Sequence, residues 1–385
     1  MIDTEIRRPP LSIDDLRDDW DALYRRSRRE PSVSFEWSRA LIRSRAADRR
    51  SFLVVLRRAG RVVGLIPMMK ERERLFGRSV TVLQPMEDKY ATHSDLLIEA
   101  DDGELIGAWL DAIASPAAGT WDVLQLSRLL EEQHLVGALR TELVRRRAGH
   151  RWRLEAPSFY LPLPDSYQAY LAGRSGKLRN YLKRAEKKLA AEGEVTFSRV
   201  PAGGRLDHAY DELLDIERES WKQERGTAIS AARSLEGFYR DLVETAGQAG
   251  TLHLTFLRVA GVAVAYNLGL VGGGSYFYSK TSYRQSFRRQ GAASIGRARL
   301  IEELIAEGCT ALDFPGEPYE WERQWTDSVR WHQSLLMFNR TLVGRAIGLT
   351  VKARDFFQPP SQERRIVFSA GRGVSGDDAA GADTP

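Results

Sequence analysis

Basic and small residues stand together where a strand pattern gives way to a helix pattern. The stretch FRRQGAAS, 287–294, follows the aromatic run SYFYSKTSY and precedes SIGRARLIEELIAEG, whose apolar spacing is helical. The first amides of a helix lack intrahelical acceptors and carry partial positive charge, so they bind phosphate where nearby side chains are small. Two guanidinium groups would neutralise a diphosphate. The sequence therefore predicts a pyrophosphate-binding loop made of Arg288, Arg289, Gln290, Gly291, Ala292, Ala293 and Ser294.

The spacing R-x-x-G-x-A, from Arg288 to Ala293, resembles the acyl-CoA signature of the GNAT acetyltransferase superfamily, R/Q-x-x-G-x-G/A. The stretch matches neither the dinucleotide pattern G-x-G-x-x-G nor the Walker spacing. In the family this loop joins a strand to a helix and holds the pyrophosphate of the cofactor. The resemblance implies acetyl-CoA or another acyl-CoA as co-substrate; the alternative is an ordinary basic loop that caps a helix.

The loop lies in the second of two copies of one order of elements. Each half of the chain reads as two helices, a hairpin, a third strand, a helix and a strand, and the hairpins turn at Ala59-Gly60 and Ala260-Gly261. Both hairpins contain the letters L-R-x-A-G, which indicates duplication. The first half has no R-x-x-G-x-A at the matching place, so we expect it to be a degenerate copy.

The expected organisation follows from this repeat. Prolines interrupt regular structure near 157–166, which places the boundary there. We expect an N-terminal degenerate GNAT-like domain over 1–160, a catalytic GNAT-like domain over 161–358 and a disordered tail over 359–385, which is poor in large apolar groups. The resemblance implies an α/β (α+β) fold of tandem GNAT-like domains, each a mixed, mostly antiparallel sheet flanked by helices.

A more specific resemblance extends over most of residues 15–335. The segments PSVSFEWSRAL, GRVVGLIPM, ESWK and DFPGEPYEWERQWTD are similar, in this order, to the CelD-type acetyltransferases associated with cellulose and exopolysaccharide biosynthesis. Their tandem architecture is shared with the Fem-type aminoacyltransferases of peptidoglycan synthesis. One departure is Gln290 before Gly291, where many relatives carry a proline-glycine pair.

Acyl transfer from a thioester needs few groups. The acceptor must lose a proton, the developing oxyanion needs donors, and the thiolate benefits from an acid. No covalent enzyme intermediate is required, which agrees with the lack of a convincing Ser–His–Asp or Cys–His set. Cys309 is the only cysteine and the six histidines are scattered, so no metal site is predicted from spacing.

The candidates for catalysis are four residues, Lys280, Asp313, Tyr319 and His93. Strand alternation puts Tyr276, Tyr278, Lys280 and Ser282 on one face, where Lys280 would contact substrate or have a lowered pKa, or else reach into water. Asp313 ends the strand TALDF and would orient substrate, act as a base or cap a loop.

The other two candidates depend on the family resemblance and on how the two copies pack. The GNAT resemblance assigns protonation of the thiolate to a tyrosine in the region of Tyr319. His93 would act as a general base if the two copies pack face to face; otherwise it is a surface histidine.

The acceptor side is expected at the end of the second copy's first helix, as in GNAT folds. Glu217, Trp221 and Lys222 lie there, and Trp221 would stack on a sugar ring or belong to the core. Tyr278 and Asp95 complete the predicted substrate contacts.

The segment 174–189 is an amphipathic helix with a basic face. We weigh three roles for that face. It is exposed to solvent only, it holds an adenosine 3′-phosphate or an anionic glycan, or it contacts tRNA phosphates, as expected for a Fem-like protein. No aromatic platform accompanies it, and the net charge of +5 is mild, so nucleic acid is not the expected partner. No apolar run approaches a membrane span, and the chain reads as cytosolic.

The leading hypothesis is an acyl-CoA-dependent N- or O-acyltransferase, with acetyl as the first acyl group to test. The resemblance implies a sugar or small polar acceptor linked to envelope or exopolysaccharide synthesis. The alternatives are an aminoacyl-tRNA-dependent transferase acting on a peptidoglycan precursor and a non-catalytic binding protein. The acyl group, the acceptor and the oligomeric state stay open.

Overall fold

The structure is a computed structural model of the whole chain. It describes residues 1–45, 50–86, 93–99, 103–224, 226–314, 316 and 318–357, so the predicted tail lies outside the described residues. The described chain forms two compact units, residues 1–156 with 330–357 and residues 157–329. Residues 330–357, which the sequence prediction gave to the second domain, group with the first unit, because strand β13 (Val329–Phe338) pairs with strand β6 (Val123–Leu130).

The first unit is built on a mostly antiparallel sheet. Its strand order is β1-β2-β3-β4-β6-β13, and only β4 and β6 are parallel among these neighbours. The remaining strands are β1 (Ile2–Arg7), β2 (Ser51–Arg58), β3 (Arg61–Leu75), β4 (Arg78–Pro85), the short β5 (Leu97–Ile98) beside β3, and β7 (His150–Pro162), which runs on into the second unit.

Helices cover both faces of this sheet. They are α1 (Arg17–Arg26), α2 (Phe35–Ser44), α3 (Gly103–Ala114), α4 (His134–Arg145) and α11 (Leu342–Phe357). Trp109 of α3 and Leu139 of α4 are buried with Leu124, whereas Ile347 of α11 is buried with the next residue along β6, Val123. Since successive strand residues point to opposite faces, α3 and α4 lie on one face and α11 on the other.

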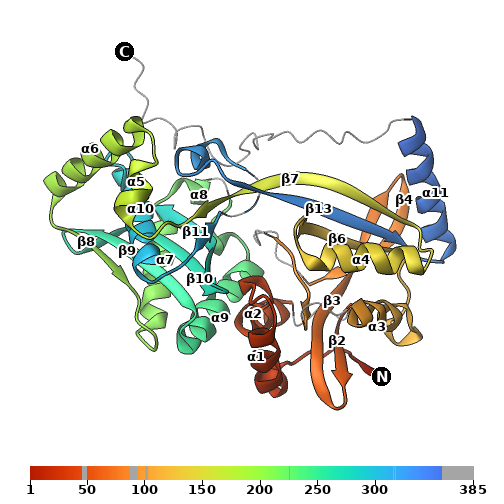
Figure 1. Cartoon of the computed structure of the whole chain (residues 1–385). Coiled ribbons are helices and arrows are strands. Elements are labelled where there is room, and N and C mark those ends of the chain that lie inside the picture. The colour runs from red at the N-terminus through yellow and green to blue at the C-terminus, as the bar shows by residue number, and fades with distance from the viewer. Residues whose placement is uncertain are drawn as a thin grey trace. The chain divides into compact units, whose positions relative to one another are not determined.

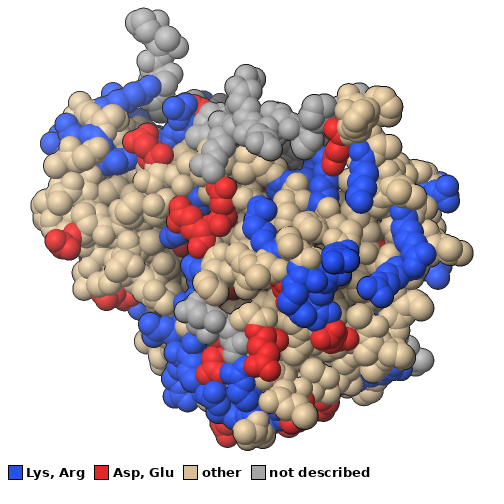
Figure 2. All heavy atoms as spheres, turned by 45° about the vertical axis from the view of Figure 1, so that its right-hand side comes forward, with Lys and Arg blue, Asp and Glu red and all other residues tan. Residues whose placement is uncertain are grey.

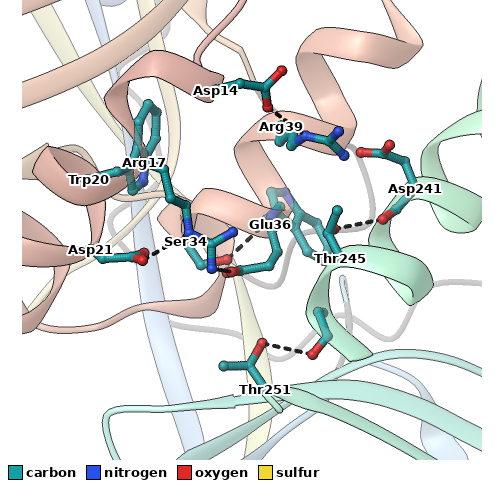
Figure 3. Close-up of polar contacts among 12 residues, drawn as sticks. Asp14, Arg17, Trp20, Asp21, Ser34, Glu36, Arg39, Asp241, Thr245 and Thr251 are labelled. Atoms are coloured by element: carbon teal, nitrogen blue, oxygen red, sulfur yellow. Dashed lines mark hydrogen bonds and ion pairs between the residues drawn. The ribbon is translucent and has the colours of Figure 1, made fainter. Parts of the chain in front are cut away.

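An ion pair joins the first two helices (Figure 3). Arg17 donates to Asp21 at 2.9 Å and to the buried carboxylate of Glu36 at 2.9 Å. The Ser34 hydroxyl accepts from the Trp37 amide and caps α2. The contact with Asp21 lies within α1, so the Arg17–Glu36 ion pair is the one that connects α1 and α2.

The second unit repeats this architecture. Its sheet order is β7-β12-β11-β10-β9-β8, with β11 and β12 parallel and the other pairs antiparallel. Its own strands are β8 (Val195–Arg199), β9 (Leu252–Val259), β10 (Val262–Gly272), β11 (Ser275–Tyr283) and β12 (Ala311–Asp313). Its helices are α5 (Tyr167–Ala172), α6 (Gly176–Glu192), α7 (Leu206–Arg218), α8 (Trp221–Glu224), α9 (Arg233–Ala249) and α10 (Ala292–Ala306).

Two adjacent residues of β10 show how the helices are layered. The Tyr266 hydroxyl donates to Glu217 of α7, and the Asn267 amide donates to the Gly296 carbonyl of α10. Because neighbouring strand residues point to opposite faces, α7 and α10 lie on opposite sides of the sheet. Helix α6 contacts α10, and α9 contacts α7, so each face carries two long helices (Figure 1).

The predicted repeat of elements is confirmed. The order α1-α2-β2-β3-β4-α3-β6 of the first unit recurs as α7-α9-β9-β10-β11-α10-β12, apart from short inserted segments. The paired turns have the same backbone, since φ is 49° at Ala59 and Ala260 and 80° and 79° at the following glycines. Positive φ at both residues is the two-residue turn that fits the twist of a hairpin. The chain is thus a mixed α/β protein with mostly antiparallel sheets flanked by helices.

The surface carries both signs of charge. On the face shown in Figure 2, lysines and arginines lie in several groups and acidic side chains lie among them. None of the described helices combines the length and apolar composition needed to cross a membrane.

Candidate functional site

The predicted loop leads directly into the N-terminus of α10. Gly291 is the N-cap residue with φ 79°, and the first intrahelical bond runs from the Ile295 amide to the Gly291 carbonyl. The amides of Ala292, Ala293 and Ser294 therefore occupy the first helical turn, where no intrahelical acceptor exists. A Cβ on Gly291 would lie 2.9 Å from both the Ala185 Cβ and the Tyr181 hydroxyl. Only glycine gives this backbone both its conformation and its close approach to α6.

The side chains before Gly291 face α6 and solvent. Arg289 is exposed, and its carbonyl accepts from the Lys188 ammonium at 3.5 Å. The Gln290 amide, expected to be a phosphate donor, donates instead to Glu192 at 3.0 Å. Arg288 is half-buried and begins the turn, because its carbonyl accepts from the Gly291 amide.

Helix α6 brings further positive charge to this loop. Its apolar side consists of the buried residues Leu178, Leu182, Ala185 and Leu189. Its exposed basic residues are Lys177, Lys183, Arg184, Lys187 and Lys188. The predicted basic face is therefore present and lies on the helix that contacts Gly291.

The parallel strands next to the loop separate. Strand β12 pairs with β11 from Ser275 to Phe277 only, whereas β11 continues to Tyr283 before the chain turns into the loop. In the register with β10, Leu268 faces Lys280 and Gly269 faces Tyr278, so Ser279 is an extra residue. Such a bulge takes the extra residue out of the regular ladder.

The bulge corrects one sequence prediction. Alternation placed Tyr278 and Lys280 on one face, but the Tyr278 hydroxyl donates to Asn267 at 2.5 Å, on the α10 side. The Lys280 ammonium donates to the Thr227 carbonyl at 3.1 Å and lies 5.6 Å from the Tyr239 ring centre of α9. One inserted residue reverses the faces, so the two side chains point to opposite sides of the sheet.

A buried carboxylate organises the α7 side. Glu217 is 1% exposed, and its carboxylate accepts from the Lys222 ammonium at 2.9 Å, the Tyr266 hydroxyl at 2.6 Å and the Ile229 amide at 2.5 Å. Burial opposes the charge, but Lys222, Lys280 and the two other donors outweigh it and lower the pKa of Glu217 to about 2. The structure brings together three predicted site residues, Glu217, Lys222 and Lys280, as a compensated charge cluster.

Trp221 and Glu219 flank this cluster. Trp221 begins α8 and is half-buried against the core of the second unit. Glu219 forms an ion pair with Arg284, and its carbonyl accepts from the Gln285 amide at 3.0 Å. The end of α7 is thus attached to the segment that leads from β11 into the loop.

Asp313 and Tyr319 lie beyond the short parallel strand. Asp313 is 3% exposed at the end of β12, opposite Phe277. Tyr319 is half-buried, and its amide donates at 3.0 Å to Glu322 in the short helix Glu320–Gln324. Burial raises the pKa of Glu322 to about 8, a feature that the sequence analysis missed.

His93 and Asp95 belong to the first unit. The His93 Nε2 atom lies 2.7 Å from the Glu30 carboxylate, and His93 is 2% exposed, so it is not a surface histidine. Burial and the negative charge of Glu30 raise the pKa of Asp95 to about 7. Asp95 also borders a cavity of about 240 Å³ together with Arg28 and His134.

Sequence reasoning missed the partners that complete the Glu217 cluster. Tyr266, Thr227 and Tyr239 come from a strand, a loop and a helix, and none stands in a motif. The available signal was the pair Tyr266 and Asn267 inside a strand that is otherwise apolar, since buried polar side chains require partners.

Residues 176–323 match the family model described as an acetyltransferase (GNAT) domain. This segment is a GNAT domain. Solved structures share the fold of nearly the whole chain. The crystal structure of FemX has a TM-score of 0.60 at 10% identity, covering 89% of this chain and 100% of that one. No curated protein matches the sequence.

A second structure agrees at the level of the fold. It is the C-terminal domain of a putative lysylphosphatidylglycerol synthetase from Agrobacterium fabrum, with a TM-score of 0.54 at 14% identity. It covers 93% of this chain and 100% of that one. The GNAT domain contains the loop, the Glu217 cluster and both parallel strands β11 and β12.

Replacing Glu217 by glutamine tests the charge cluster of the GNAT domain. The substitution leaves Lys222 and Lys280 buried without their counter-charge, so the free energy of unfolding at pH 7 should fall by about 3 kcal/mol. The folded pKa of Glu217 lies below its ordinary value of 4.5, so its contribution is present above pH 4.5 and disappears as the pH falls towards 2. Urea unfolding should therefore show the difference between wild type and variant narrowing over that window.

Glu219→Gln is the matched control for this experiment. Its side chain is 58% exposed and paired with Arg284, so the loss should stay below about 1 kcal/mol. A Glu217→Gln protein as stable as Glu219→Gln at pH 7 would contradict the compensated cluster.

Gly291→Ala tests the close approach of the loop to α6. The new Cβ adds backbone strain at φ 79° and a clash with Ala185 and Tyr181, which together should cost about 2–4 kcal/mol. Gly308→Ala isolates the strain, because Gly308 has the same φ of 79° and nothing within 4 Å of a Cβ. Thermal unfolding of both variants measures the difference; equal losses would remove the steric argument.

Proposed function

We propose that the GNAT domain transfers an acyl group from an acyl-CoA to an amine or hydroxyl of a small polar acceptor. The observation that carries this proposal is the N-terminus of α10, with its left-handed Gly291, beside the end of β11. Backbone amides and two arginines at this position suit a diphosphate. The pairing of β12 with β11 ends at Phe277, and the acyl arm of the cofactor would extend towards this point.

The chemistry is a displacement at the thioester carbonyl. The acceptor nitrogen or oxygen forms a bond to the carbonyl carbon, the carbon–sulfur bond breaks, the acceptor loses a proton and the thiolate gains one. The bulge at Ser279 offers a backbone amide outside the ladder for the developing oxyanion. We assign Tyr319 as the acid for the thiolate and Asp313 as the group that receives or orients the acceptor proton.

The Glu217 cluster supports the acceptor side without reacting. Glu217 is fully buried and has hydrogen bonds from three partners, so its role is to hold α7, α8 and β10 together. Lys280 is held near this carboxylate and remains a positioning group in the proposal. Trp221 is half-buried at the start of α8, where its ring can contact a sugar.

The first unit is proposed to be non-catalytic. Its β4 and β6 are parallel neighbours at Val82 and Val123, as β11 and β12 are in the second unit. Further along β6, however, Leu129 pairs with Ser94, and β5 pairs with β3. In this proposal, the chain's own segment 94–98 takes the place that a cofactor arm would need.

The acceptor proposed here is a sugar or a related polar metabolite of envelope or exopolysaccharide synthesis. The similarity of several sequence segments to CelD-type acetyltransferases supports this choice. A second candidate is aminoacyl transfer from tRNA, which the exposed basic face of α6 favours as a contact for phosphates.

Calorimetric titration with acetyl-CoA and desulpho-CoA tests the cofactor. Both ligands should bind with similar affinity, because the loop holds the diphosphate that they share. Arg288→Gln should weaken binding of both by about tenfold or more through loss of a charge-assisted contact. Arg345→Gln, an exposed change in α11, serves as the control and should leave affinity unchanged.

Two results would favour a different function for this protein. Salt-sensitive affinity for tRNA with no affinity for CoA would select the aminoacyl alternative. A folded protein that binds neither would favour the non-catalytic alternative.

Tyr319→Phe tests the proposed acid. Without the hydroxyl the thiolate leaves unprotonated, so turnover should fall by about 100-fold while the affinity for acetyl-CoA stays the same. Thiol release measured with a thiol-reactive dye reports turnover, and calorimetry reports affinity. Unchanged turnover would remove Tyr319 from the mechanism.

A further inference from the structure

A second polar cluster lies at the other end of α10. His253 stands near the start of β9, Glu303 and Glu307 lie one turn apart at the end of α10, and Arg199 ends β8. Helix α10 has 15 residues and spans about 22 Å, which separates this cluster from the loop at the N-terminus of the helix.

His253 is buried with no hydrogen-bond partner on either ring nitrogen. Its Nε2 atom points at two carboxylates, 3.4 Å from Glu307 Oε2 and 4.0 Å from Glu303 Oε1. The second oxygen of Glu303 is also buried without a partner. Leaving such groups unsatisfied costs free energy, so this arrangement calls for a further group between them.

The charges in the cluster point to a cation. Two carboxylates at i and i+4 repel each other, and both stand at the negative end of the helix dipole. Arg199 neutralises Glu307 by donating to its Oε1 atom at 2.5 Å. The Arg199 guanidinium also donates to the Leu252 carbonyl at 3.4 Å. The Glu307 Oε2 atom, Glu303 and His253 face the remaining space.

We propose that His253, Glu303 and Glu307 form a binding site for a divalent transition metal of the Zn²⁺ class. One imidazole and two carboxylates suit this class better than Mg²⁺ or Ca²⁺, which prefer oxygen ligands alone. The three ligand atoms all lie within 4.8 Å of one another. Tetrahedral Zn²⁺ needs ligands about 3.4 Å apart, so side-chain shifts of about 1 Å would complete the site.

The surroundings fit this assignment. Metal ligation requires a neutral imidazole, and the His253 side chain is fully buried, a setting that disfavours a charged ring. The side chains of Glu303 and Glu307 are 25% and 34% exposed, respectively, so an ion can enter from the solvent side. The ion would join β9 to the end of α10 and would be structural, because the acyl-transfer chemistry lies at the opposite end of the helix. Spacing in the sequence does not predict this site, because His253 stands about fifty residues before Glu303 and Glu307.

Untagged full-length protein, freed of metal with a chelator, should be titrated with ZnCl₂ by calorimetry. One equivalent should bind, and thermal unfolding should shift to higher temperature with Zn²⁺ but not with Mg²⁺. Glu303→Gln and Glu307→Gln should each weaken binding by about tenfold or more; both side chains are partly exposed, so folding should survive. Arg199→Gln should tighten binding several-fold, because it removes a positive charge beside the ion.

Glu302→Gln is the matched control, since Glu302 stands on the same helix and pairs with Arg299. It should bind Zn²⁺ like the wild type. The proposal is overturned if the wild type shows no saturable 1:1 binding, or if the Glu303 and Glu307 variants bind as well as Glu302→Gln. Acyl-CoA titration of the same variants keeps this outcome separate from the proposed activity.

Discussion

Adjacent residues of β10 must satisfy buried polar groups on opposite faces of one sheet. Tyr266 donates to the Glu217 carboxylate on the α7 side, and Asn267 donates to the Gly296 carbonyl of α10 and accepts from Tyr278. A register shift of one residue would exchange the two side chains and leave both sets unsatisfied, at a cost of several hydrogen bonds. The register of this strand therefore determines where α7 and α10 lie, and with them the Glu217 cluster and the loop.

The order of elements could be predicted because its signals are local. Apolar periodicity, the Ala-Gly turns and the small residues before α10 each report on a few neighbouring positions. The faces of β11 could not be predicted in the same way. Alternation holds only while the ladder is regular, and the extra residue at Ser279 moves Lys280 away from Tyr278. Gly269 opposite the bulge was the available sign, since a Cβ there would lie 2.4 Å from the Tyr276 ring.

Sequence patterns report on neighbouring positions, so contacts between distant parts of the candidate site could not be predicted. The loop could be predicted because its residues are contiguous, and Glu217 and Lys222 could be predicted because they stand at the end of one helix pattern. Their roles changed once the through-space partners were known, since Tyr266 is 49 positions from Glu217. A carboxylate with a lysine, a tyrosine and an amide around it is stabilised in its ionised form and is poorly suited to bind substrate directly. Sequence position groups Glu217 with Lys222, whereas burial and charge compensation are properties of the three-dimensional contacts.

The two units also satisfy the backbone groups of their parallel strands in different ways. Parallel strands that separate leave unpaired backbone groups, which must be satisfied by a ligand, by water or by the chain itself. In the first unit the chain provides the partner, because the Ser94 amide donates to the Arg128 carbonyl at 3.0 Å and Ile98 pairs with Gly64. In the GNAT domain the pairing of β12 with β11 ends at Phe277, and the loop at Gly291 comes after the rest of β11, which pairs with β10. If the GNAT domain binds an acyl-CoA as proposed, the five residues 94–98 account for the absence of that arrangement from the first unit, with no change in the order of helices and strands.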